Sequence, residues 1–262
     1  MSRIKLLTHS IKPIFDYGLS VTNTSGYCSA CGGDEVWQSA RIINDDLANS
    51  WDIDDVLRQA FDARESMFCP LCGCSFRLRQ LAESITYIYG GKSLLELLEN
   101  KYFLDLRIAE INSCGRLHGI LYTHPNLSYS EYVPSDVAIR SENLEMLTYK
   151  DNSFDLILTS DTLEHVPDVR IALKEIRRVL KPGGRHIFTI PIIWNRLTLE
   201  RQNKEPSYHG SGEPDYLVFS EFGYDMINII KECGFTVKIY KPNVINLRDT
   251  AGVIVATRTG DS

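Results

Sequence analysis

The sequence lacks any long hydrophobic run. Nowhere do about 18 apolar residues follow one another, as a membrane-spanning helix would require. The basic amino terminus, from Met1 to Ser10, also lacks the long apolar stretch and the small-residue cleavage site of a secretion signal. We therefore expect a soluble, cytoplasmic protein with no membrane partner.

An excess of positive charge is absent as well. The 262 residues include 28 Lys and Arg against 34 Asp and Glu, which gives a formal net charge of -6. This balance argues against a protein that coats nucleic acid by neutralising phosphates, although it leaves room for a local basic patch around Arg77 and Arg79. The length suits one large α/β domain with a small accessory unit, or two modest domains.

Cysteine is present in an informative arrangement. There are seven cysteines, an odd number, and four of them form two Cys-x-x-Cys pairs that are each followed directly by glycine. A glycine in this position can adopt a positive φ without strain, which lets backbone amides point at the sulfurs. The pattern predicts a closed tetrahedral zinc site with the ligands Cys28, Cys31, Cys69 and Cys72.

Such a site would be structural, because four sulfur ligands leave no position for a water molecule. A redox-active dithiol and unconnected buried cysteines are the alternatives, and Cys74 is near enough in sequence to replace Cys72. We assign residues 1–91 to a small zinc-binding module, which the metal would help to fold and which ends in a linking helix from Arg77 to Tyr89.

Residues 92–262 show the alternation of helices and strands that is typical of a parallel sheet. After a helical stretch at 93–106, the expected strands are 107–112, 127–132, 137–141, 154–160, 185–191, 235–240 and 253–257. A crossover helix at 169–180 stops at Lys-Pro-Gly-Gly, and a second amphipathic helix runs from Phe222 to Cys233. The prediction is a doubly wound, mainly parallel, seven-stranded α/β sheet whose last two strands form an antiparallel hairpin at its edge.

The most informative stretch is residues 151–191, DNSFDLILTSDTLEHVPDVRIALKEIRRVLKPGGRHIFTIP. It resembles the second half of class I S-adenosylmethionine-dependent methyltransferases of the type 11 group, in which an Asp-x-Ser-Phe-Asp strand, Leu-Glu-His-Val, a crossover helix and Leu-Lys-Pro-Gly-Gly follow in order. The resemblance implies a Rossmann-like methyltransferase with S-adenosylmethionine as its cofactor. Ser160 and Asp161 then lie at the carboxyl end of a buried strand, where ligands bind in such sheets.

The same resemblance implies a set of cofactor contacts. The loop after the first strand should carry an acidic residue and a glycine-rich turn, yet only one glycine remains in it. Asparagine tolerates left-handed geometry and cysteine is small, so we expect the turn to form with less room for the ligand. The expected contacts are Glu110, Asn112, Cys114 and Gly115 in this loop, Glu131 at the ribose hydroxyls, Asn143 and Leu144 at the adenine, and Ser160.

Methyl transfer requires an acceptor atom held in line with the methyl group, and a general base helps when that atom is an oxygen. The candidate catalytic residues are His165 of the Leu-Glu-His-Val segment, His209 in the long insert at 192–222, and Asp161. His165 has a loop-fixing role as its alternative, and His118 is expected to pack or to orient the ligand. The insert, which is rich in aromatic residues, is either a lid over the acceptor or a solvated loop.

Three functions remain open at this stage. The acidic charge and the extent of the resemblance favour an enzyme that methylates a small-molecule or saccharide-like acceptor. An RNA or protein methyltransferase that docks its substrate on the zinc module would rest on the basic residues Arg64, Arg77, Arg79 and Lys92. A noncatalytic protein that has kept the fold would explain the altered glycine loop.

Overall fold

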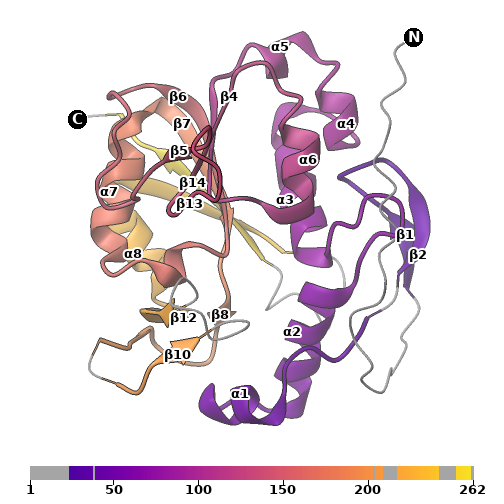
Figure 1. The fold of residues 1–262 in the computed structure, drawn as a ribbon, viewed down its shortest axis with the longest axis vertical. Helices are drawn as coiled ribbons and strands as arrows, with labels where there is room; N and C mark the ends of the chain where they lie inside the picture. Colours follow the sequence, from indigo (N-terminus) through magenta and orange to yellow (C-terminus); the bar gives the residue numbers. More distant parts are fainter. Residues whose placement is uncertain (1–23, 38, 203, 209–216, 242–251, 261–262) are drawn as a thin grey trace.

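A seven-stranded sheet forms the centre of the protein (Figure 1). The computed structural model describes residues 24–37, 39–202, 204–208, 217–241 and 252–260. In spatial order the strands are β13 (Phe235–Tyr240), β14 (Val253–Arg258), β7 (Leu180–Thr189), β6 (Phe154–Ser160), β3 (Ile108–Ile111), β4 (Leu127–Glu131) and β5 (Arg140–Ser141). β14 runs antiparallel to both of its neighbours, and the remaining pairs are parallel. The predicted doubly wound sheet with its antiparallel edge hairpin is confirmed.

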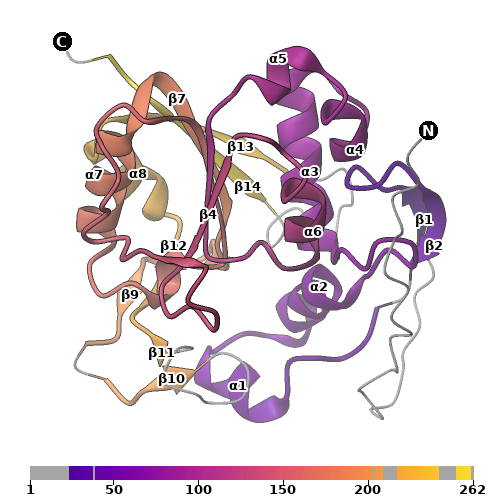
Figure 2. The ribbon, with the colours of Figure 1, turned by 45° about the horizontal axis from the view of Figure 1, so that its top comes forward.

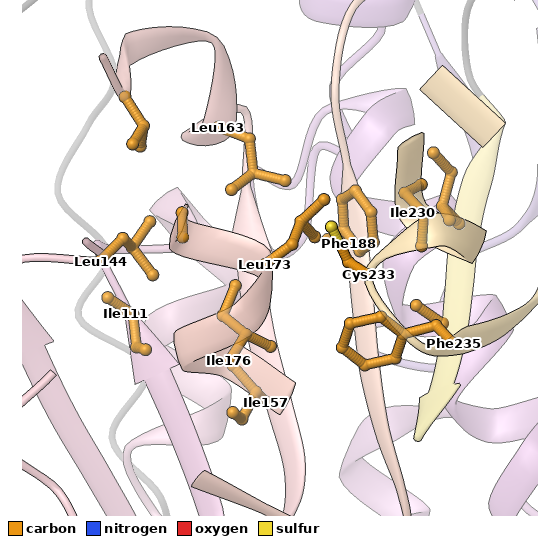
Figure 3. Close-up of a cluster of buried hydrophobic side chains, with 14 of the residues drawn as sticks. Ile111, Leu144, Ile157, Leu163, Leu173, Ile176, Phe188, Ile230, Cys233 and Phe235 are labelled. Carbon is orange, nitrogen blue, oxygen red and sulfur yellow. The ribbon is translucent and has the colours of Figure 1, made fainter. Parts of the chain in front are cut away.

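One face of this sheet is covered by α7 (Val169–Val179) and α8 (Met226–Glu232). α7 begins at Asp168, whose side chain accepts hydrogen bonds from two amides of the first turn, and its apolar residues recur at helical spacing. Figure 3 shows Leu173 of α7, Phe188 of β7 and Ile230 of α8 gathered in one buried cluster. This burial fixes the crossover helix against the strands that carry the predicted ligand site.

The other face is covered mainly by α3 (Phe76–Tyr89), with η1 (Gly115–Leu117) and α6 (His118–Leu121) beside it. Leu81 of α3 shares a core with Leu156 and Ile187 of the sheet, and Cys28 and Cys69 belong to the same cluster. The helix that we expected to link two units therefore packs directly on the sheet. The division of the chain at residue 91 stays a prediction.

Two segments that are distant in sequence meet below the sheet (Figure 2). The N-terminal segment contains β1 (Thr24–Tyr27), β2 (Asp34–Trp37), α1 (Asp45–Ser50) and α2 (Asp55–Ser66). The insert after β7 contains β8 (Ile192–Ile193), β9 (Leu199–Glu200), β10 (Ser207–Tyr208), β11 (Leu217–Val218) and β12 (Ser220–Gly223). Ile193 of the insert packs with Trp51 and Phe61, so the insert and the N-terminal helices support each other.

The predicted start of the second amphipathic helix at Phe222 was wrong. Residues 220–223 form β12, which is buried along its whole length and pairs with β8 and β9, and α8 begins only at Met226. A side chain at Gly223 would place its Cβ 2.1 Å from the carbonyl oxygen of Arg196. Glycine at this position permits the close approach of two backbone segments, a tertiary feature that helical spacing does not reveal.

Three other boundaries also differ from the prediction. The helical stretch at 93–106 consists of two short helices, α4 (Leu94–Leu97) and α5 (Lys101–Leu104), because the Asn100 side chain caps the second one. The strand expected from residue 137 is reduced to β5, and Val137 is fully exposed. The residues of Lys-Pro-Gly-Gly already belong to β7, which begins at Leu180. Among the described residues no helix has the length and apolarity needed to cross a membrane.

Candidate active site

A cavity of about 600 Å³ opens at the carboxyl ends of β3, β4 and β6. The chain winds outward in opposite directions from β3 and β6, and such a switch point is where open α/β sheets form a ligand crevice. Seven of the residues predicted from the sequence lie on its wall: Asn112, Glu131, Asn143, Leu144, Ser160, Asp161 and His165. The geometry therefore brings most of the predicted site together, from segments spread over more than 50 residues.

The loop after β3 is shaped by hydrogen bonds from its own residues. Asn112 adopts a left-handed φ of 58°, and its side-chain oxygen accepts a hydrogen bond of 2.9 Å from the amide of Tyr132. Glu110 is fully buried and accepts a hydrogen bond of 2.7 Å from the Cys114 amide. Glu110 lies in β3, Cys114 and Gly115 lie at the start of η1, and none of the three lines the cavity. Their role in the described structure is to set the course of the backbone.

Two acidic residues at this end of the sheet are joined through a pair of aromatic rings. The Nδ1 atom of His118 lies 2.6 Å from Glu110, and this hydrogen bond raises the pKa of His118. The His118 ring stands 4.1 Å from that of Tyr129, whose hydroxyl donates to the carboxylate of Glu131. Burial and this contact raise the pKa of Tyr129. Glu131 is thereby held in place at the cavity wall.

The predicted adenine segment is a tight turn rather than a helix. The side-chain oxygen of Asn143 accepts a 2.9 Å hydrogen bond from the amide of Glu145, and the carbonyl of Asn143 accepts one from Met146. The amide of Glu142 donates to the carbonyl of Glu131 over 2.9 Å, which ties this turn to the end of β4. The chain between β4 and β6 thus contains no helix, and its short connection reaches the cavity.

Asp161 lies at the end of β6 with a left-handed φ of 47°. Arg64 of α2 donates two hydrogen bonds to its carboxylate, over 2.6 and 2.7 Å, and Nε of Arg77 lies 3.2 Å from the same group. Burial alone would raise the pKa of Asp161, but the two guanidinium groups lower it below its usual value. Asp161 therefore stays ionised and is a weak proton acceptor.

His165 belongs to η2 (Leu163–His165) and faces the cavity. Its Nδ1 atom donates to the carbonyl oxygen of Leu217 over 2.9 Å, which leaves the lone pair of the neutral ring on Nε2. Burial lowers the pKa of His165, so the ring is neutral near pH 7. The predicted catalytic residue His209 lies outside the described residues.

The neighbouring Glu164 was not singled out by sequence reasoning. Its side chain is fully buried, and neither carboxylate oxygen has a hydrogen-bond partner within the described part of the chain. Burial and the nearby charge of Asp161 raise the pKa of Glu164 well above its usual value. Burial thus favours the protonated form of Glu164, while its backbone carbonyl accepts a 2.8 Å hydrogen bond from the amide of Phe219 in the insert.

The four cysteines of the two Cys-x-x-Cys pairs form one cluster, with all their Sγ atoms within 4.8 Å of one another. The Sγ atoms of Cys28 and Cys72 are 3.7 Å apart, and those of Cys31 and Cys69 are 3.8 Å apart. A tetrahedron with Zn–S bonds of about 2.3 Å has edges of about 3.8 Å, so these thiols fit a zinc ion. Cys74 is buried nearby but is not one of the four.

The two cysteine loops have the same backbone design. The glycines that follow them, Gly32 and Gly73, have φ values of 80° and 73°. Their amides donate to the carbonyl oxygens of Cys28 and Cys69 over 2.7 and 2.8 Å. The expectation that both glycines would turn through positive φ is confirmed.

The basic residues near the cysteines do not form a surface patch. Arg79 is buried, its guanidinium lies 3.2 Å from the centroid of the Trp37 ring, and burial lowers its pKa to about 10. Arg64 is 1% exposed, and Arg77 is engaged by Glu65 and Asp161. These three arginines are therefore occupied within the fold, whereas Lys92, the fourth basic residue considered for docking, is exposed.

Residues 106–188 match the family described as a methyltransferase domain. Together with the strand order and the cavity at the switch point, this match decides the assignment. Residues 106–188 are a methyltransferase domain.

Relatives of this methyltransferase domain include two bacterial proteins. A demethylmenaquinone methyltransferase of Lactiplantibacillus plantarum is 37% identical over 107 residues, which cover 35% of this chain and 45% of the relative. An uncharacterized 37.1 kDa protein in transposon TN4556 of Streptomyces fradiae is 30% identical over 122 residues, which cover 46% of this chain and 35% of the relative. The chain thus spans less than half the length of these relatives.

Solved structures with a similar arrangement are distant in sequence. An S-adenosylmethionine-dependent methyltransferase from Mesorhizobium loti has a TM-score of 0.41 and 16% identity, and the match covers 58% of this chain and 90% of that one. The [4+2]-cyclase SpnF has a TM-score of 0.43 and 15% identity, with 82% of this chain and 94% of that one covered.

Proposed function

We propose that the protein transfers a methyl group from S-adenosylmethionine to a small-molecule acceptor. The observation that carries the proposal is the single cavity that gathers Asn112, Glu131, Asn143 and Ser160 at the switch point of a methyltransferase domain. These residues come from four different segments, and their gathering on one cavity wall supports the cofactor contacts that we expect from the family resemblance. A noncatalytic protein would have no need to keep all of them on one wall.

The residues present suit the parts of this cofactor. The Glu131 carboxylate, oriented by Tyr129, would accept hydrogen bonds from the ribose hydroxyls. The turn at Asn143 and Leu144 would receive the adenine, and the backbone after Asn112 would approach the amino-acid part. When bound, S-adenosylmethionine supplies an electrophilic methyl group, and the protein needs no nucleophile of its own.

His165 is our candidate for the proton acceptor when a hydroxyl of the acceptor must lose its proton, as in methylation at that oxygen or at a ring carbon of a hydroquinone. Its Nδ1 proton is engaged by Leu217, its ring is neutral, and it lies on the same cavity wall as Asp161. Nε2 would take the proton of an acceptor hydroxyl as that oxygen, or the ring carbon that it activates, attacks the methyl group. Asp161 is less suited to this step, because its two arginine partners stabilise the ionised carboxylate. His209 remains a second candidate.

The acceptor is proposed to be a small molecule with an apolar body. The cavity wall beyond His165 is formed by Val166, Pro167, Leu217 and Phe219. These side chains suit a flat apolar molecule better than the saccharide-like acceptor that we also expected. The names of several relatives specify demethylmenaquinone, which agrees with an acceptor of quinone type.

We further propose that Cys28, Cys31, Cys69 and Cys72 hold a structural zinc ion. The sulfur spacings and the paired glycine turns support this ion, and four thiolates leave no open position on it for a substrate. The ion would fix the loop between α2 and α3.

Calorimetric titration with S-adenosylmethionine and with S-adenosylhomocysteine tests the proposed activity first. Micromolar dissociation constants for both are expected, followed by transfer of a labelled methyl group to demethylmenaquinol. The variant His165→Gln should lower kcat by about 100-fold or more without changing cofactor affinity, whereas Glu99→Ala at an exposed position should leave kcat within about threefold. Absence of cofactor binding by the folded protein would refute the proposal and favour a noncatalytic role.

A further inference from the structure

The contact between Arg64 and Asp161 joins the N-terminal segment to the cavity. The two residues are 97 positions apart in sequence, and the guanidinium meets the carboxylate through two parallel hydrogen bonds of 2.6 and 2.7 Å. Arg64 is 1% exposed, so its charge has lost nearly all contact with water. A buried guanidinium is tolerated only when carboxylates or carbonyls take up its hydrogen bonds.

Arg77 reaches the same place from the next helix. Its Nε atom lies 3.2 Å from Asp161, its Nη1 atom donates to the hydroxyl of Ser160, and it is also paired with Glu65 over 3.0 Å. Two guanidinium groups therefore face the carboxylates of Glu65 and Asp161. The cluster is neutral as a whole, and Asp161 is its only carboxylate on the cavity wall.

The two arginines stand on either side of the second cysteine pair. Arg64 lies in the last turn of α2, Arg77 lies in the first turn of α3, and the loop between these helices contains Cys69 and Cys72. The cysteine cluster thus fixes the orientation of α2 and α3, and with it the direction in which both arginines reach the end of β6. Asp161 has a left-handed φ, which the surrounding contacts must maintain.

We propose that Arg64 is a positioning residue, which the N-terminal segment supplies to hold the Asp161 carboxylate against the positively charged part of the bound cofactor. S-adenosylmethionine carries an ammonium group, and the Asp161 carboxylate, held in one position by Arg64, would accept a charge-assisted hydrogen bond from it although the cluster as a whole is neutral. This inference rests on the proposed function. It gives the N-terminal segment a role in the reaction beyond the stability of the fold.

The test compares variants of two arginines on α2 in the full-length, zinc-loaded protein. Arg64→Met should weaken S-adenosylmethionine binding by about 10- to 100-fold, because Asp161 loses its two-point partner. Arg64→Lys keeps the charge but not the planar fork and should recover part of that loss. The control is Arg58→Met, since Arg58 pairs only with Asp45 and Asp55 among the described residues. It should change the affinity by less than about twofold.

A double-mutant cycle separates positioning from a purely structural role. Asp161→Asn should weaken cofactor binding to a similar extent, and Arg64→Met combined with Asp161→Asn should bind about as well as Asp161→Asn alone. Wild-type affinity in folded Arg64→Met or in Asp161→Asn would overturn the inference, as would losses that simply add. If Arg64→Met does not fold, Arg64→Lys and Asp161→Asn decide the question. Failure of the wild-type protein to bind the cofactor would refute the proposed function instead.

Discussion

The imidazole of His118 and the carboxylate of Glu110 are hydrogen-bonded over 2.6 Å, and Glu110 is completely buried. The same carboxylate accepts the amide of Cys114, so this pair supports the loop that begins at Asn112. His118 is the more accessible partner, and its charge depends on pH. The pair gives the first prediction.

Replacement of His118 by Gln should destabilise the protein most at low pH. The pKa of His118 is raised in the folded state, so its stabilising effect is complete below the unfolded value of about 6.5 and is lost as the pH rises through the folded value. We expect a difference of about 1 to 3 kcal/mol in the free energy of unfolding at pH 5.5, shrinking above pH 8. Denaturant unfolding at several pH values measures it, and a difference independent of pH would contradict the assigned charge.

His186 should contribute with the opposite sign. It is fully buried, its Nε2 atom lies 2.9 Å from the hydroxyl of Thr159, and burial lowers its pKa to about 3. The unfolded chain takes up a proton below about pH 6.5 and the folded chain does not, so stability is lost as the pH falls toward 3. Through this single group the free energy of unfolding should fall by about 2 kcal/mol between pH 6.5 and pH 5.

The variant His186→Gln isolates that contribution. It should lower stability at pH 7.5 but lose less on acidification than the wild-type protein. If the free energies of unfolding of the two proteins fall in parallel between pH 7.5 and pH 5, the loss of stability in acid has another origin.

Glu131→Ala should weaken binding of S-adenosylmethionine and of S-adenosylhomocysteine equally, by about 1 to 3 kcal/mol, because both contain the ribose. Tyr129→Phe should have a smaller effect, since it only releases the orientation of the Glu131 carboxylate. Calorimetry measures both. The exposed carboxylate Glu99 provides the control Glu99→Ala, and unchanged affinity in Glu131→Ala would show that the ribose lies elsewhere.

The wild-type protein should bind about one zinc ion per chain. Cys69→Ser should bind less zinc and should have a lower melting temperature. Cofactor affinity should fall with it, because the same loop directs Arg64 and Arg77 toward Asp161. Cys233→Ser alters a buried cysteine in the core on the α7 and α8 face and should retain zinc. Elemental analysis and calorimetry test both variants. Full zinc content in Cys69→Ser would remove Cys69 from the ligand set.

Much of this architecture was predictable because it depends on local order in the sequence. The apolar run of β6 followed by Ser160 and Asp161, and the helical spacing of Leu173 and Ile176, identify a strand, a crossover and a strand end. The paired Cys-x-x-Cys-Gly segments predicted four sulfurs in one cluster, and the structure brings them together.

The contacts that were missed depend on the tertiary fold. The sequence suggests that Arg64 is a basic residue near the surface, because the residues next to it in the sequence do not indicate a partner 97 positions away. Glu164 is part of a recognisable motif, but only the packing shows that its carboxyl group is buried without a hydrogen bond among the described residues, 3.8 Å from Nε2 of His165. Phe222 fits a helical pattern by chance, whereas the backbone contact at Gly223 requires a strand.

The position of α3 limits how this N-terminal segment can be exchanged between proteins. Its first turn carries Arg77, its middle covers Leu156 and Ile187, and the cysteines precede it directly. Grafting the cysteine loops onto another methyltransferase would therefore require transplanting α3 together with the sheet surface that it covers. In any recombination between related proteins, the helix and the sheet surface that it covers would have to be transferred together.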